Sequence, residues 1–179
     1  MEIHLIRHTT PDVEKNICYG QSNVLLKDTF QDEYKLVLES LPYNADVIYT
    51  SPLTRCTQLA EEIAQALRLP VKKDDRLKEM NFGAWEMQRW DDVDQDALMK
   101  WMNNYQHERC PQGESYFDLM KRLEDFLEEI RMEKSQSIII VTHAGVIKTC
   151  NAILNSVPFN DSMALKVEYG SLLTMKILI

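Results

Sequence analysis

The sequence predicts an α/β fold: a three-layer α/β/α sandwich with a mostly parallel central sheet and a helical cap insertion. Three observations support this prediction. Strand-like and helix-like segments alternate along the chain, one strand candidate is apolar on both faces, and one long segment interrupts the alternation. Alternation favours parallel strands joined by helices that cover both faces of the sheet. With 179 residues, the chain fits a single domain spanning residues 1–179.

The strand candidates are short, largely apolar segments. They cover residues 2–6, 46–50, 71–74 and 137–142. The last of them, SIIIVT, is β-branched and apolar on both faces, which favours a central strand. The tail, residues 164–179, has two apolar runs around Gly170 and predicts a closing hairpin with an antiparallel edge.

The predicted helices show apolar residues three and four positions apart. They cover residues 27–41, 51–67 and 115–134, and a fourth helix begins near Gly145. In the second helix, Ser51 is the expected N-cap and Pro52 takes the first helical position. In the third helix, the expected buried face consists of Phe117, Met120, Leu123, Leu127 and Ile130.

Residues 81–114 interrupt the alternation. This segment holds all three tryptophans and three of the nine methionines, mixed with acidic residues. Aromatic and methionine residues at helical spacing usually serve packing, so the segment predicts a helical excursion with its own small core. It is also a candidate cap over a substrate pocket. Both interpretations hold together, because a cap needs a core too.

Composition and charge narrow the class of protein. No apolar run approaches the ~18 residues of a membrane span, and a net charge of −8 argues against unspecific binding to nucleic acid or anionic lipid. The start, MEIHLIRH, does not have the pattern of a signal peptide, so we expect a cytoplasmic protein. The four cysteines lie far apart and are expected to be reduced. The sequence leaves the oligomeric state open.

Cationic and imidazole side chains follow three of the predicted strands. Arg7 and His8 follow the first strand, Arg55 lies in the first turn of the helix after the second, and His143 follows residues 137–142. Because the carboxyl ends of parallel strands meet at one edge, these groups are expected to converge. Guanidinium groups and helix N-termini bind phosphoryl groups well. The expected ligand is therefore a small-molecule phosphate ester.

A neutral imidazole at His8 is a candidate nucleophile toward phosphorus. The leaving alkoxide needs a proton, and Glu79 in RLKEMNFGAWE is the candidate donor because it enters the excursion shortly after a strand. Glu86 competes with it, and spacing alone does not separate the two. No pair of His, Cys or Asp residues stands at metal-ligand spacing, so neither a metal nor a cofactor is predicted.

These residues resemble the histidine phosphatase superfamily, also called phosphoglycerate mutase-like, essentially from end to end. Five motifs carry the resemblance, in this order: LIRHTTP, SPLTRCTQLAEEI, RLKEMNFGAWE, QGESYFDLMKRLEDF and IIIVTHAGVIK. The resemblance implies a single histidine phosphatase domain in which His8 is phosphorylated during turnover. It also implies that Arg7, Arg55 and His143 bind the phosphoryl group and that Glu79, rather than Glu86, donates the proton.

Two stretches, RHTTPDVEKNICYGQSNVLL and FGAWEMQRW, look most like the α-ribazole-5'-phosphate phosphatases of cobalamin nucleotide-loop assembly. Thr9 stands where the family usually has Gly, and its hydroxyl is a candidate phosphate ligand. Asn16 is the candidate counterpart of a family Asn, after a short insertion. The expected substrate pocket contains Trp85, Trp90 and Gln21.

The expected function is therefore a metal-independent phosphomonoesterase acting through a phosphohistidine. A phosphoglycerate mutase or a broad-specificity sugar phosphatase of the same superfamily is the enzymatic alternative, although the chain is short for a mutase. A non-catalytic phospho-ligand binding module is the alternative of another class. Such a module would be expected to lose the nucleophile or the acid, and both His8 and Glu79 are present.

Overall fold

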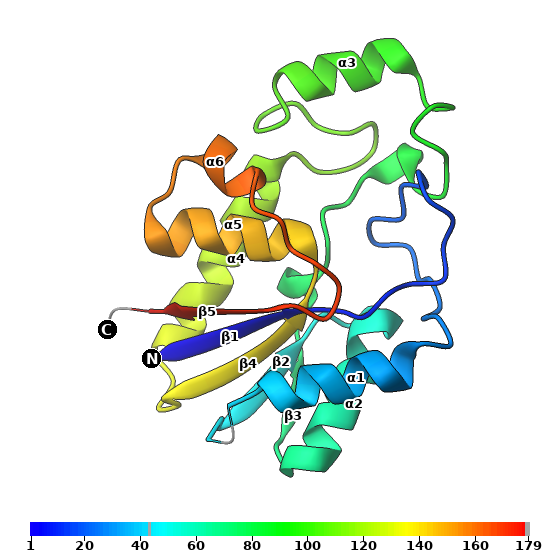
Figure 1. The fold of residues 1–179 in the computed structure, drawn as a ribbon. Coiled ribbons are helices and arrows are strands. Elements are labelled where there is room, and N and C mark those ends of the chain that lie inside the picture. The colour runs from blue at the N-terminus through cyan, green and yellow to red at the C-terminus, as the bar shows by residue number, and fades with distance from the viewer. Residues whose placement is uncertain (43, 178–179) are drawn as a thin grey trace.

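The computed structural model describes residues 1–42 and 44–177 and confirms the α/β prediction (Figure 1). Its five-stranded sheet has the order β3-β2-β4-β1-β5, in which only β5 runs antiparallel to its neighbour. The strands are β1 (Glu2–Arg7), β2 (Val47–Thr50), β3 (Val71–Lys73), β4 (Ser137–Thr142) and β5 (Leu172–Lys176).

The central strand β4 is buried along its whole length, as its apolar sequence predicts. It pairs with β1 on one side and β2 on the other, and the register aligns Arg7 with Thr142 and Thr50 with Val141. The three strands therefore end at nearly the same level. The residues that follow them emerge together at one edge of the sheet.

Helices cover both faces of the sheet and complete the three layers (Figure 1). Helices α1 (Phe30–Ser40) and α2 (Thr54–Leu67) pack against Ile139 and Val141, on one face of β4. Ile138 and Ile140 point to the opposite face, into the core that they share with α4 and α5. The helices on this side are α4 (Tyr116–Arg131), α5 (Ala144–Asn155) and the short α6 (Phe159–Met163).

Two helix details differ from the predictions. Helix α2 begins at Thr54 with Leu53 as its N-cap, so Ser51 and Pro52 precede the helix. In α4, Phe117 is 54% exposed, whereas Leu119 and Phe126 are fully buried. Helix α4 packs against both the sheet and α5, so its buried face is broader than the predicted stripe. The start of α4 is fixed by a capping box between Ser115 and Asp118.

The predicted closing hairpin is wrong. Residues 164–169 form no strand, and Gly170 adopts a positive φ of 68° in a turn that leads into β5. β5 pairs with β1 instead, at the edge of the sheet. The segment before Gly170 lies at the carboxyl end of β1, where the Gly170 amide donates to the carbonyl of Arg7.

Residues 81–114 form the predicted excursion, but most of it is loop. It contains the nine-residue helix α3 (Gln95–Asn103) and a short 3₁₀ turn at Gly83–Trp85. Its core is not separate, because Trp85 and Val93 belong to the same buried cluster as the inner side chains of α4 and α5. No helix in the described part of the chain has the length and hydropathy needed to cross a bilayer.

Candidate active site

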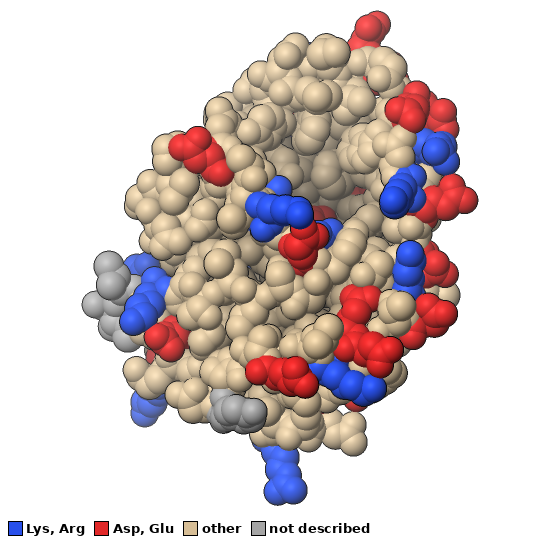
Figure 2. Space-filling view, in the orientation of Figure 1, with Lys and Arg blue, Asp and Glu red and all other residues tan. Residues whose placement is uncertain are grey.

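The predicted cluster of Arg7, His8, Arg55 and His143 assembles at the carboxyl edge of the sheet. The rings of His8 and His143 are 5.2 Å apart, and the His8 amide donates to the carbonyl of Thr142 at 3.0 Å. His8, Arg55 and His143 are each at most 1% exposed. A space-filling view shows a hollow between the sheet edge and the excursion, with charged side chains beside it (Figure 2).

His8 is held as a neutral imidazole with one free nitrogen. Its Nδ1 lies 2.7 Å from the carbonyl oxygen of Thr9, which can only accept, so Nδ1 carries the proton. Burial, with the nearby Arg55 and Arg7 guanidinium groups, holds the pKa of His8 well below its usual value. The lone pair is therefore on Nε2, as a nucleophile requires.

His143 is also buried and neutral. Its pKa is lowered well below the usual value by burial, by Arg55 and by His8. Its Nε2 lies 2.8 Å from the hydroxyl of Ser51 and 3.5 Å from the sulfur of Cys56. Ser51, which the sequence assigns to the N-cap, is thus a hydrogen-bond partner of His143. Cys56 keeps its thiol proton at neutral pH because burial raises its pKa.

Both arginines are oriented by backbone carbonyls. Arg7 Nη1 donates to Val167 at 2.6 Å, and Arg55 donates to Ser22 at 2.8 Å and to Gly20 at 2.6 Å.

Three buried polar atoms at this edge have no hydrogen-bond partner among the described residues: Arg7 Nε, Arg55 Nε and Thr9 Oγ1. Buried polar groups are rarely left unpaired, and a phosphoryl oxygen is a suitable acceptor for all three. The local chemistry therefore fits an anion, and Thr9 has a free hydroxyl for it.

Two tyrosines, which the sequence analysis did not single out, lie against the cluster. The Tyr169 ring centroid is 3.7 Å from Cζ of Arg7 and 5.5 Å from the His8 ring, and the Tyr19 ring lies 5.1 Å from Cζ of Arg55. Their hydroxyls are 3.0 Å apart. Burial and the Tyr169 hydroxyl raise the pKa of Tyr19, so this phenol is neutral.

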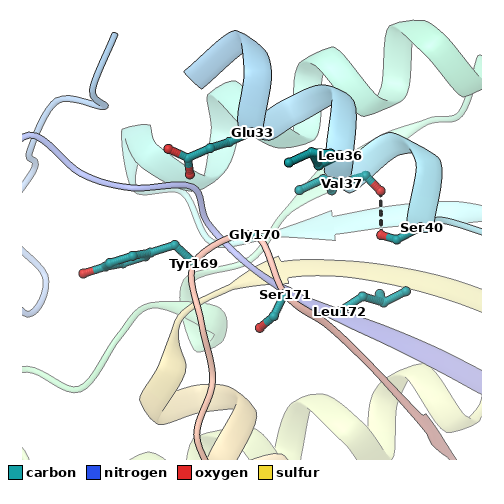
Figure 3. A pocket seen from close by; sticks show the side chains of 8 residues that line it. All are labelled: Glu33, Leu36, Val37, Ser40, Tyr169, Gly170, Ser171 and Leu172. Carbon is teal, nitrogen blue, oxygen red and sulfur yellow. Dashed lines mark hydrogen bonds between the residues drawn. The ribbon is translucent and has the colours of Figure 1, made fainter. Parts of the chain in front are cut away.

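Tyr169 borders cavities on two sides. One, of about 320 Å³, is also lined by Tyr19, Asn16 and Trp90. The other, of about 400 Å³, lies between the turn at Tyr169 and helix α1, with Glu33 on its wall (Figure 3). His8 is almost fully covered, and the Tyr169 ring is one of the groups packed against it.

The two candidate acids have different surroundings. Oε1 of Glu79 accepts from the amide of Met80 at 2.9 Å, and Oε2 accepts from the amide of Gly145 at 3.2 Å. A Cβ at Gly145 would lie only 2.3 Å from Oε1, so a larger residue there would make the Glu79 carboxylate shift. Glu79 thus lies at the N-terminus of α5, where its partner Gly145 follows His143 by two residues.

Glu86 is committed to holding loops together. Its Oε1 accepts from the amides of Gln21 at 2.9 Å and Phe82 at 3.1 Å, and its Oε2 accepts from the Ser22 hydroxyl at 2.6 Å. It joins the loop around residue 21 to the start of the excursion. This arrangement favours Glu79 as the proton donor, although that role stays a prediction.

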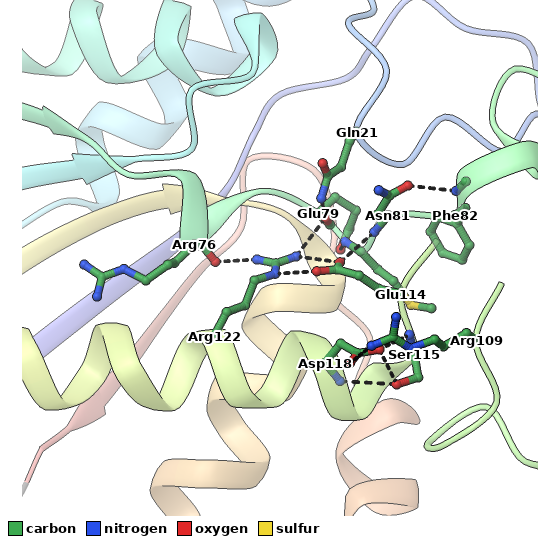
Figure 4. A network of polar contacts seen from close by, with 12 residues as sticks. Gln21, Arg76, Glu79, Asn81, Phe82, Arg109, Glu114, Ser115, Asp118 and Arg122 are labelled. Carbon is green, nitrogen blue, oxygen red and sulfur yellow. Dashed lines mark hydrogen bonds and ion pairs between the residues drawn. The ribbon is translucent and has the colours of Figure 1, made fainter. Parts of the chain in front are cut away.

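A polar network holds the backbone around Glu79 (Figure 4). Arg122 of α4 donates to the carbonyls of Arg76 and Glu79 and forms an ion pair with Glu114 at 3.0 Å. Glu114 also accepts from the amide of Asn81 at 2.9 Å. The side chain of Gln21, an expected pocket residue, donates to the same Glu79 carbonyl at 2.9 Å. The network links α4 to both ends of the segment that carries Glu79.

Two of the predicted site residues lie elsewhere. Asn16 has an exposed side chain that donates to Asp91 at 2.6 Å and contacts no member of the arginine and histidine cluster. Trp85 is 3% exposed and packs edge-to-face against Trp90 and Trp101, so it belongs to the core. In a loop segment of mixed composition, the sequence does not show whether an aromatic residue packs into the core or lines a pocket. Trp90 does line a cavity, next to Tyr19 and Tyr169.

The family model described as the histidine phosphatase superfamily (branch 1) matches residues 3–177. The chain belongs to the histidine phosphatase superfamily. This membership confirms the resemblance, and with it the assignment as a phosphatase that hydrolyses phosphate esters.

Among its curated relatives, an adenosylcobalamin/alpha-ribazole phosphatase of Escherichia coli is 30% identical over 129 residues, 70% of this chain and 64% of that protein. Phosphoserine phosphatase 1 of Hydrogenobacter thermophilus is 32% identical over 123 residues, 66% of this chain and 58% of that protein. Each alignment covers less than two thirds of the relative. The crystal structure of an alpha-ribazole phosphatase from Shigella flexneri superposes with a TM-score of 0.91 at 26% identity, covering 99% of this chain and 91% of that one.

Proposed function

We propose that this histidine phosphatase hydrolyses a small phosphate monoester in two steps through a phosphohistidine at His8. The observation that carries the proposal is the neutral His8 ring beside two arginines. Among the residues that the structure describes, His8 Nε2 and the buried Nε groups of both arginines have no hydrogen-bond partner. Neither a metal nor a cofactor is needed for this chemistry. In the described part of the chain, no group of His, Cys, Asp and Glu residues has the geometry of a metal site.

In the first step, His8 Nε2 attacks phosphorus, forming the N–P bond as the bond to the ester oxygen breaks. Arg7 and Arg55 offset the charge on the non-bridging oxygens, and His143 and Thr9 hydrogen-bond to them. Glu79 gives its proton to the leaving alkoxide. In the second step, the Glu79 carboxylate takes a proton from water as that water attacks phosphorus. The N–P bond breaks, and phosphate and neutral His8 are restored.

For the substrate, we propose α-ribazole 5'-phosphate. Support comes from the stretches around residues 7–26 and 82–90, and from the names of the Escherichia coli relative and the Shigella flexneri structure. A phosphoserine-type substrate is the second candidate, because a relative named for that activity is 32% identical. Superfamily members exchange substrates on one scaffold, so the fold alone does not choose between them.

The test is a comparison of kcat/KM across α-ribazole 5'-phosphate, O-phosphoserine, 3-phosphoglycerate, a sugar bisphosphate and a phosphopeptide. We expect the first to have the highest value and the activity to persist after exhaustive chelation. A higher value for O-phosphoserine would replace the proposed substrate. Loss of activity on chelation, with recovery on adding Mg²⁺ or Zn²⁺, would contradict the mechanism.

A further inference from the structure

A cavity of about 260 Å³ lies between the excursion and the helices α5 and α6. It is lined by Trp101, Met102, Tyr105, Tyr116, Lys148 and Met163. None of these side chains was among the predicted pocket residues. The three aromatic rings contact one another, with centroids 5.7 to 6.4 Å apart, and form one continuous apolar wall.

This cavity lies next to Glu79. The amide of Gly145 contacts the Glu79 carboxylate, and Lys148 follows three residues later, on the same face of α5. Burial and Arg7 lower the pKa of Lys148, and Glu79 opposes the shift. Burial and Glu79 likewise raise the pKa of Tyr116. Both walls of the cavity therefore lie within electrostatic reach of the proposed acid.

The in-line geometry of phosphoryl transfer also favours this cavity. In phosphoryl transfer the attacking and leaving atoms lie on opposite sides of phosphorus, roughly in line. With His8 on one side, the leaving oxygen lies on the side of the group that protonates it, Glu79. The rest of the leaving group then extends beyond Glu79.

We propose that the cavity between α3, α5 and α6 is the leaving-group subsite, and that it takes a flat aromatic group bearing a hydrogen-bond acceptor or a negative charge. This inference rests on the proposed function. The aromatic wall supplies the stacking surface. Lys148 supplies the polar contact, because among the described residues its ammonium group makes one hydrogen bond, to the Met163 carbonyl at 2.8 Å, and retains two donors.

Three esters of similar primary alcohols test the inference: 2-phenylethyl phosphate, 2-cyclohexylethyl phosphate and 4-(2-phosphonooxyethyl)benzoate. The wild-type chain is expected to prefer the aromatic esters. Met102 and Met99 are matched positions, because both are exposed methionines of α3, at 56% and 59%, and only Met102 lines the cavity. Met102→Ala should lower kcat/KM for 2-phenylethyl phosphate by about tenfold. Met99→Ala should leave it unchanged.

Lys148→Met tests the polar contact separately. It should lower kcat/KM for the benzoate ester about tenfold more than for 2-phenylethyl phosphate, because only the benzoate presents a carboxylate to the ammonium group. Equal effects of Met102→Ala and Met99→Ala, or an equal loss on all three esters in Lys148→Met, would overturn the subsite. The proposed function would survive both results, since p-nitrophenyl phosphate would still be hydrolysed through His8. A wild-type chain that hydrolyses no ester would overturn the proposed function itself.

Discussion

The sheet edge and the excursion contribute to one site by different physical means. Arg7, His8 and His143 directly follow strands whose register is set by ladder hydrogen bonds, and the central strand is fully buried. The excursion, residues 81–114, contains the nine-residue helix α3 and is held by contacts between aromatic rings and by hydrogen bonds to Glu86 and Glu114. The proposed phosphoryl site thus lies on rigid elements, whereas the excursion is mostly loop and shares its buried residues with the core under the sheet.

Glu79 lies at the boundary between the two regions. It precedes the excursion in sequence, yet its carboxylate is bound to the N-terminus of α5 and its carbonyl to Arg122 of α4. Glu86, seven residues later, accepts hydrogen bonds from Gln21, Ser22 and Phe82 and so joins the excursion to the loop around residue 21. The comparison predicts that Glu79 acts in chemistry and Glu86 in stability.

The largest expected effect separates these two carboxylates. Glu79→Gln removes the proton donor and should lower kcat for an alkyl phosphate by about 10² to 10⁴, while largely sparing p-nitrophenyl phosphate, whose leaving group needs no proton. Glu86→Gln should lower kcat for both substrates to a similar extent. It should also lower the free energy of unfolding by about 1 to 3 kcal/mol, because a side-chain NH₂ cannot accept the hydrogen bonds of that oxygen. Steady-state kinetics and urea denaturation supply the two readouts.

The opposite pattern would move the acid into the excursion. If Glu86→Gln lowers kcat for the alkyl phosphate far more than for p-nitrophenyl phosphate, and Glu79→Gln lowers kcat equally for both, Glu86 is the proton donor. The assignment of Glu79 to chemistry and of Glu86 to stability would then be wrong.

A smaller effect is expected from Arg122, which positions Glu79 through backbone carbonyls. Arg122→Leu should lower kcat for alkyl phosphates by up to about 10², because small displacements of a catalytic group are costly, and should lower p-nitrophenyl phosphate turnover less. Arg131→Leu is the matched control, since Arg131 lies on the same helix and is exposed. A loss equal for both substrates would reduce Arg122 to a purely structural role.

The smallest effect is expected where α4 begins, away from the chemistry. Ser115→Ala removes the capping box and should lower the free energy of unfolding by about 1 kcal/mol. Ser115→Thr retains a hydroxyl and should restore most of it. Denaturation midpoints measure both variants. An unchanged midpoint in Ser115→Ala would show that packing of Leu119 and Leu123 alone fixes the start of the helix.

The phosphate side of the site was predictable because it depends on strand ends. The residues that follow parallel strands lie at one edge of the sheet, so the sequence alone predicts that Arg7, His8, Arg55 and His143 lie together. The sheet itself follows from the same alternation. The sequence places Ser51 at this edge but predicts that it caps α2, because a Ser-Pro pair commonly precedes a helix. In the structure its hydroxyl contacts His143 instead.

The remaining parts depend on loop conformation, which local patterns do not encode. Tyr169 precedes Gly170 in a segment that looks like a strand, and only the turn brings its ring onto Arg7. Lys148 is separated from the excursion by a helix and a strand, and nothing in its neighbourhood predicts the facing Trp101. Trp85, an aromatic residue near the proposed acid, packs into the core, and its sequence neighbourhood does not indicate that burial.

The central claim is that His8 carries the phosphoryl group between the two steps. Rapid quenching in base after mixing with a ³²P-labelled ester should trap a labelled protein that is stable in base and loses its label in acid, as a phosphohistidine does. The His8→Ala chain should remain folded by circular dichroism and acquire no label. A label that survives acid and is lost in base would indicate an acyl phosphate on a carboxylate. That result, or label retained by His8→Ala, would contradict the account.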